Sequence, residues 1–244
     1  MNSSEDSEWI SFSDIMTGLM IVFLFISISY MQQVKKEQQQ KDEIFEKYQS
    51  IKTSIYNDLS KSFSSGFEQW KMEIEPDLSI KITDASALFE AQLVTDDVRL
   101  KSEFKIFLGQ FTPIFFEIIL NPLYADKIAE VRIEGHTGIS AASYEFENDY
   151  YQNMIVLSQK RSNKVLEYMM SLDSYAELSD EQKNRLRFFM TSNGLAYGKA
   201  LDGNGEYKFY SKKVINEIKS MRVEFKIVTN SADVIDRWVE RSKK

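Results

Sequence analysis

Asp14 is an acidic side chain inside an apolar stretch, and its type and place are suited to ion transport. It is the only charged residue between Trp9 and Gln33. That stretch is long enough to span a membrane, for which roughly 20 mostly apolar residues are needed. A carboxylate within a membrane helix costs about 2.5–3.5 kcal/mol on insertion scales, so such residues usually face a partner or a water path. We expect Asp14 to conduct ions. An acid that only holds helices together is the alternative.

Thr17 follows Asp14 by one helical turn and is the second residue expected on the ion path. Its hydroxyl could hydrogen-bond the acid or a passing water. Gly18, on the same side of the helix, would allow another helix to come close.

His136 is the only histidine, and the chain has no cysteine. A lone histidine lacks the companions that a zinc site or a nucleophilic triad requires. We therefore expect His136 to fix the loop in which it lies. The run 202–205, Asp-Gly-Asn-Gly, lacks the remaining ligands of a calcium loop and is predicted to be a turn. No metal, no cofactor and no enzymatic activity are predicted.

The composition indicates one membrane helix followed by one soluble domain. The chain has 244 residues, 43% of them hydrophobic, and a net charge of −7. An acidic chain of this kind is not expected to bind nucleic acid, because phosphate contacts require clustered lysine and arginine.

The chain divides by pattern into five segments. Residues 1–8 form a short tail, 9–31 a transmembrane helix, 32–77 a helical linker, 78–229 the soluble domain and 230–244 a C-terminal helix. The acidic start argues against a cleaved signal peptide. In the linker, one helical stripe consists of Ile44, Tyr48, Ile51, Ile55 and Leu59. This stripe either docks on the following domain or pairs two copies of the chain as a coiled coil.

The soluble domain alternates strand and helix patterns, which predicts an α/β sandwich of a sheet covered by helices. Strands are expected at 78–82, 128–134, 188–191 and 222–228. Helices are expected at 99–120, with a break or kink near Pro113, and at 151–172, 177–187 and 214–220. The stretch 84–98 is predicted to be a loop.

Two spaced motifs resemble the peptidoglycan-binding domain of OmpA-like proteins. They are Glu134-Gly135-His136-Thr137 and Leu157-Ser158-Gln159-Lys160-Arg161-Ser162. The resemblance implies an α+β fold with a mixed sheet. It also implies a peptidoglycan site at Arg161, Leu157, Asn153 and Thr137, in which the arginine holds the carboxylate of diaminopimelate.

The chain departs from this family pattern at three positions. Gly138 stands where the family has an aspartate that binds the ligand ammonium, Met154 where it has an asparagine, and Met221 where it has an arginine. Asp149 and Glu145 are candidates for the missing acid.

The membrane stretch resembles the B subunits of MotB-type rotary stators, through Trp9 and the run from Asp14 to Met20. The form Phe12–Met20, with its short tail, is most similar to the B subunits of Zorya anti-phage defence systems. This resemblance implies two copies of the chain, a homodimer, inside a ring of ZorA-like subunits in the inner membrane. A passive wall tether and a flagellar MotB-like stator subunit are the alternatives.

Two signals for the orientation conflict. A peptidoglycan-binding domain must be periplasmic, which places the amino terminus in the cytoplasm. Lys35 and Lys36 follow the span, and the positive-inside rule would place them in the cytoplasm. We follow the resemblance. The sequence leaves open whether the ion is H⁺ or Na⁺.

Overall fold

The computed structural model describes residues 3–64, 70–83, 88–90, 98–124, 126–138 and 148–230. The side chains of residues 3–11, 47, 48, 148 and 149 lie outside this description. The chain divides into two compact units, residues 1–50 and 51–244. Nearly all of the helix predicted at 230–244, and most of the loop predicted at 84–98, lie outside the described residues.

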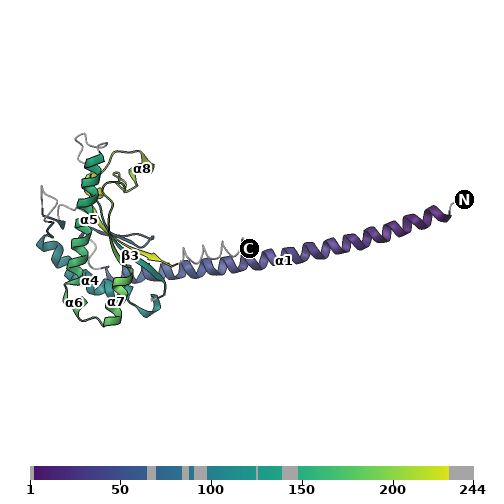
Figure 1. Ribbon diagram of the computed structural model, residues 1–244, viewed down its shortest axis with the longest axis horizontal. Coiled ribbons are helices and arrows are strands. Elements are labelled where there is room, and N and C mark those ends of the chain that lie inside the picture. Colours follow the sequence, from purple (N-terminus) through teal and green to yellow (C-terminus); the bar gives the residue numbers. More distant parts are fainter. Residues whose placement is uncertain are drawn as a thin grey trace. The chain divides into compact units, whose positions relative to one another are not determined.

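The first unit consists of helix α1, which begins at Ser3 and continues to Ser62 in the second unit (Figure 1). By length and composition, α1 could cross a membrane. Within its apolar part, the hydroxyls of Thr17 and Ser27 donate to the carbonyl oxygens of Ser13 and Phe23, at 2.8 and 2.7 Å. These bonds satisfy both hydroxyl donors inside the helix, as an apolar surrounding requires.

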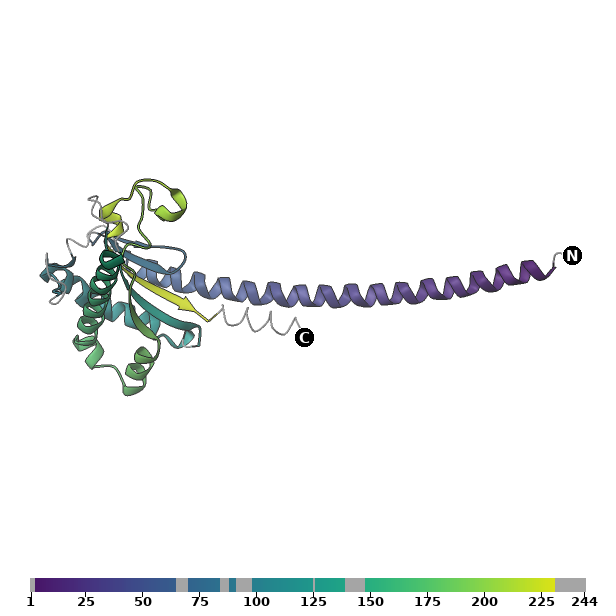
Figure 2. The same cartoon turned by 45° about the horizontal axis from the view of Figure 1, so that its top comes forward.

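The second unit is built on a five-stranded mixed sheet with strand order β1-β2-β5-β3-β4. Only β3 and β4 run parallel, and the other neighbours are antiparallel. The sheet and the helices that pack on it are visible in Figures 1 and 2. The predicted fold class, a mixed sheet with helices, is therefore confirmed. The strands are β1 Met72–Ile74, β2 Ser79–Thr83, β3 Ile128–Gly135, β4 Met190–Gly194 and β5 Arg222–Thr229.

Two long helices cover one face of the sheet. They are α4, Ser102–Ile119, and α5, Asn148–Met170. The α4 helix continues through Pro113 without the break that the sequence suggests. The shorter elements are η1 Pro122–Tyr124, α6 Asp173–Ala176, α7 Asp180–Phe189, α8 Lys208–Ser211 and α9 Glu217–Ser220.

Phenylalanines of α4 form the centre of the core. Phe107, Phe111 and Phe115 recur every four residues, so they share one helix face, and consecutive rings stack with centroids 5.3 and 5.0 Å apart. Phe111 also packs on Phe225 of β5, at 4.8 Å. Such aromatic pairs add stability beyond the area they bury.

The last turns of α1 are part of this core. Ile55 and Leu59 are fully buried, and Tyr124 donates a hydrogen bond of 2.5 Å to Asp58. For this part of the predicted stripe, docking on the domain is the observed arrangement.

Three local predictions require correction. β1 is not predicted, because three residues are too few to show an alternating pattern. β4 begins at Met190 rather than at 188, because a capping box at Ser179 starts α7 and Phe189, in its last turn, is buried. The helix predicted at 214–220 is restricted to α9, because residues 215 and 216 bond back to the strand-like bridge at residues 201 and 202.

The two faces of the sheet differ in chemistry. Alternate residues of a strand point to opposite faces, and Val131, Ile133 and Phe225 lie in the apolar core under α4 and α5. The intervening positions carry charges on the other face, in the set Glu130, Arg132, Glu134, Arg222, Glu224 and Lys226.

Candidate functional site

The ends of the parallel strands β3 and β4 approach the backbone of α5 closely. A Cβ atom on Gly135 would lie 2.2 Å from the carbonyl oxygen of Ser158. One on Gly194 would lie 2.4 Å from the backbone nitrogen of Gln159. Real Cβ contacts are never this short, so both positions require glycine while strands and helix keep this spacing. This contact positions the loops that follow the two strands.

Hydrogen bonds fix these loops to α5. The backbone N–H of Thr137 donates to the carbonyl oxygen of Ala196 at 2.8 Å. In turn the N–H of Ala196 donates to Oγ of Ser158 at 3.0 Å. The N–H of Gly194 donates to Oε1 of Gln159 at 2.8 Å. The first residues after the two strands are therefore connected to the middle of α5.

Arg161 lies on α5 one turn after this connection. Its guanidinium carbon is 5.0 Å from the centre of the Phe89 ring, a cation–π contact. The side chain is half-buried, and burial lowers the pKa of the guanidinium, which nevertheless stays protonated at neutral pH. No carboxylate among the described residues pairs with Arg161. Its N–H groups can therefore donate hydrogen bonds to the carboxylate of a ligand.

The other predicted wall-site residues are divided between two places. Asn153 and Leu157 precede Arg161 by eight and four residues, so all three share one side of α5. Asn153 is exposed and Leu157 packs partly against the core. Thr137 is buried, and its hydroxyl has no hydrogen-bond partner among the described residues. Its link to α5 runs through Ala196 rather than through Arg161.

Two of the departures from the family pattern are neighbours in space. A Cβ on Gly138 would lie 3.0 Å from Cγ of Met221 and 3.7 Å from Cβ of Glu217. The side chain of Met221 thus borders the place that a larger residue at position 138 would take. Glu217 is the acidic residue whose Cβ lies beside Gly138. Asp149 and Glu145, the two candidates that were predicted for the missing acid, have side chains outside the described part.

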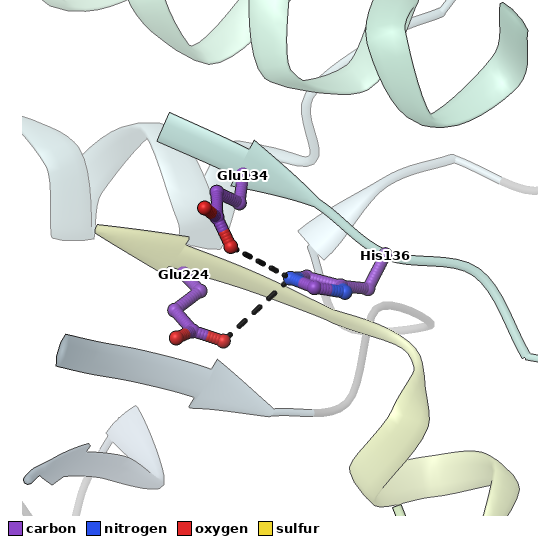
Figure 3. Close-up of side chains that lie close together, drawn as sticks. All are labelled: Glu134, His136 and Glu224. Atoms are coloured by element: carbon purple, nitrogen blue, oxygen red, sulfur yellow. Dashed lines mark ion pairs between the residues drawn. The ribbon is translucent and has the colours of Figure 1, made fainter. Parts of the chain in front are cut away.

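His136 lies between two carboxylates on the charged face of the sheet (Figure 3). Its Nε2 is 3.7 Å from Oε2 of Glu134 and 3.6 Å from Oε2 of Glu224. All three side chains are at most 3% exposed. The two glutamates face each other in the β3–β5 register, an arrangement of like charges that is unfavourable by itself.

Two cations balance these glutamates. Nε of Arg222 donates to Oε2 of Glu224 at 3.1 Å, and Nζ of Lys199 donates to Oε2 of Glu134 at 3.4 Å. Burial lowers the pKa of His136 to about 4. Burial would raise the pKa of Glu134, but His136 and Lys199 together lower it to about 2. At neutral pH the cluster thus holds two anions, two cations and a neutral imidazole.

This charge balance makes the Glu134–His136–Glu224 group a poor metal site, although its ligand atoms lie within 4.8 Å of one another. The oxygens nearest the imidazole already pair with Arg222 and Lys199. A divalent ion would add two uncompensated charges to a buried site, which is strongly unfavourable. The backbone N–H of His136 donates to the carbonyl oxygen of Arg222 at 3.0 Å, which joins the residue after β3 to the start of β5. The two ring nitrogens of His136 have no hydrogen-bond partner among the described residues, so the loop-fixing role of its side chain stays a prediction.

The predicted ion-path residues are both on α1. Asp14 and Thr17 lie on consecutive turns. The Thr17 hydroxyl, however, donates to the carbonyl oxygen of Ser13 and not to the Asp14 carboxylate.

The comparisons place the chain among known proteins. No family model matches it. It is 32% identical, over 228 residues, to the Zorya protein ZorB of Escherichia coli (strain Crooks), covering 93% of this chain and 90% of ZorB.

The similarity to solved structures is lower. A putative MotB-like protein from Desulfovibrio vulgaris is 17% identical, with a TM-score of 0.45 over 75% of this chain and 98% of that one. The cell wall anchor of the T6SS from Pseudomonas aeruginosa is 15% identical, with a TM-score of 0.41 over 70% and 96%. The identity to ZorB extends over nearly the full length of both chains, and the chain therefore belongs to the ZorB family of Zorya proteins.

Proposed function

We propose that this chain is the B subunit of a proton-driven, stator-like complex of the inner membrane that acts in anti-phage defence. In this role Asp14 carries protons, and the second unit holds the complex to peptidoglycan. The observation that carries the proposal is the near full-length similarity to ZorB, in a chain whose candidate membrane helix has one acid, Asp14, in its apolar part between Trp9 and Gln33.

The role of Asp14 follows from its position. In the apolar part of a membrane helix, a carboxylate is stable only beside a partner or water. The Thr17 hydroxyl donates its hydrogen bond to the Ser13 carbonyl oxygen. Its own oxygen can still accept a hydrogen bond from a passing water. We propose that a ring of ZorA-like subunits around two copies of this chain supplies the other wall of the path.

An exchange of one atom tests this role. Asp14→Asn keeps the shape of the side chain and removes its titration. Asp42→Asn is the matched control, because Asp42 is an acid of the same helix in its polar part. We expect Asp14→Asn to abolish phage protection at equal expression and Asp42→Asn to retain it. Full protection by Asp14→Asn would refute proton conduction and favour a passive wall tether.

For peptidoglycan, we propose Arg161 as the group that binds the ligand carboxylate. Its guanidinium has no carboxylate partner among the described residues, and its planar fork suits a carboxylate. We further propose that Glu217 binds the ligand ammonium in place of an acid at position 138, because its Cβ lies 3.7 Å from where a Cβ of residue 138 would be.

Sedimentation of the full chain, in detergent, with purified cell-wall sacculi tests both residues. Arg161→Ala and Glu217→Gln should each reduce the retained fraction. Arg187→Ala is the control, since Arg187 is an exposed arginine of α7. Retention of Arg161→Ala equal to that of the control would remove Arg161 from the site.

The proposed orientation has the amino terminus in the cytoplasm and the second unit in the periplasm. It agrees with a wall-binding role and opposes the charge signal of Lys35 and Lys36. A reporter fused to the carboxyl terminus should be active only if it functions in the periplasm. Activity of a reporter restricted to the cytoplasm would reverse the orientation and exclude wall binding.

A further inference from the structure

The segment between β4 and β5 exposes a cluster of large apolar side chains. Exposed fractions are 69% for Phe209, 78% for Tyr210, 87% for Val214 and 58% for Ile218. The segment includes α8, which lies beyond one end of the sheet, whereas α6 and α7 lie toward the other (Figure 1). The rings of Phe209 and Tyr210 are in contact, with centroids 5.2 Å apart. Several large exposed apolar side chains in one segment indicate a binding surface.

The exposure is not a result of local fraying, because the segment is held at both ends. The N–H of Lys208 donates to the carbonyl oxygen of Ala200 at 2.9 Å, and that of Asn216 to Leu201 at 2.8 Å. Asp202 is fully buried and accepts the N–H groups of residues 204 and 206 through Oδ1, at 2.8 and 3.0 Å. The turn predicted at 202–205 is thus a rigid base for the exposed cluster.

Lysines accompany the apolar side chains. Residues 207–218 contain Lys208, Lys212 and Lys213 and one acid, Glu217, although the whole chain has a net charge of −7. Nζ of Lys212 lies 4.6 Å from the centre of the Phe209 ring. Lys213 pairs with Glu206 at 3.3 Å. The surface therefore combines two exposed aromatic rings, the exposed aliphatic side chains of Val214 and Ile218, and positive charge.

We propose that this surface, comprising Phe209, Tyr210, Lys212, Val214 and Ile218, docks on an anionic phospholipid bilayer. Aromatic rings are enriched at the headgroup level of membranes, and lysines beside them are attracted to anionic lipids. A hydroxyl-rich glycan would give Val214 and Ile218 no apolar contact, whereas the boundary between headgroups and acyl chains would. A chain with a membrane helix is also tethered beside a bilayer, which raises the effective concentration of lipid at this surface.

The absence of cysteine allows a site-specific probe in the full chain. Tyr210→Cys is labelled with an environment-sensitive fluorophore and reconstituted in vesicles of phosphatidylcholine, with or without an equal part of phosphatidylglycerol. Nitroxide-labelled lipid, a quencher, is placed either in the same vesicles or in a second population added later. Phe188→Cys is the control, because Phe188 is 85% exposed on α7. Val214→Cys provides a second labelled position that keeps Tyr210.

With phosphatidylglycerol, we expect quenching at positions 210 and 214 to exceed that at position 188 several-fold, and to fall on adding salt or on Lys212→Gln. Quenching by lipid of the same vesicles would mean that the surface binds the chain's own bilayer. Quenching by lipid of the vesicles added later would mean that it binds a second bilayer. Equal quenching at all three positions, or no dependence on anionic lipid, would overturn the proposal. A probe that responds to purified sacculi and not to vesicles would also overturn it. None of these readouts depends on Asp14 or Arg161.

Discussion

Gly135 gives the sharpest test of how strand and helix meet at the candidate site. Replacement by alanine would place a Cβ 2.2 Å from the carbonyl oxygen of Ser158 and 3.1 Å from its carbonyl carbon. Both atoms are helix backbone, so no side-chain rotation relieves the overlap, and β3 or α5 must move. Overpacking of this kind costs about 1–3 kcal/mol. For a unit of this size, each kcal/mol lowers the melting temperature by about 2–4 °C.

Gly109 is the matched control, because it is a glycine of the same unit with the opposite surroundings. It lies inside α4 and is exposed, and a Cβ there would meet nothing within 4 Å. Gly109→Ala should therefore stabilise the unit by about 0.5–1 kcal/mol, since glycine is unfavourable in a helix interior. Thermal unfolding of the full chain in detergent, followed by tryptophan fluorescence, measures both. A Gly135→Ala variant that melts no lower than the parent, beside a stabilised Gly109→Ala, would refute the close approach of β3 to α5.

Two further predictions concern buried polar groups. His136 has a folded-state pKa of about 4 against an ordinary value of 6.5. The unfolded chain thus takes up this proton first, and stability should fall by roughly 3 kcal/mol as the pH drops from 6.5 toward 4. The pKa of Glu134 is lowered from 4.5 to about 2, so the unfolded chain takes up this proton first and stability falls further below pH 4.5. Melting temperatures measured across this pH range test the prediction. They should change less with pH in His136→Asn than in the parent chain. Tyr124→Phe removes the 2.5 Å bond to Asp58 and should cost about 1.5–3 kcal/mol, measured by urea unfolding.

The regular elements were predictable wherever the residue pattern alone determines them. The alternation in 128–134 and 222–228 predicts β3 and β5, because one face of each strand must be apolar to meet the helices. β1 could not be found this way, since three residues do not establish a period. The boundary of β4 was also missed, because Phe188 and Phe189 suit a strand or a helix and the α7 cap decides between them.

The charged cluster could not be predicted, although its residues are visible in the sequence. Glu134 and His136 were separated from Glu224 by about ninety residues, and only the β3–β5 register makes them opposite. The same holds for Gly138 and Met221. As sequence positions they are two independent departures from a family pattern. In the structure they are neighbours, because the side chain of Met221 borders the space above Gly138.

The buried charges of the sheet act on the pairing of β3 with β5. Glu134 and Glu224 oppose each other, and Arg222 and Lys199 compensate them, so the group gives little net stability compared with an apolar one. Its effect is on register. A slip of β5 by one residue would turn these charges toward α4 and α5 and expose Phe225. Because that alternative is so costly, β5 and β3 have one allowed pairing, which fixes the place of His136 directly after β3.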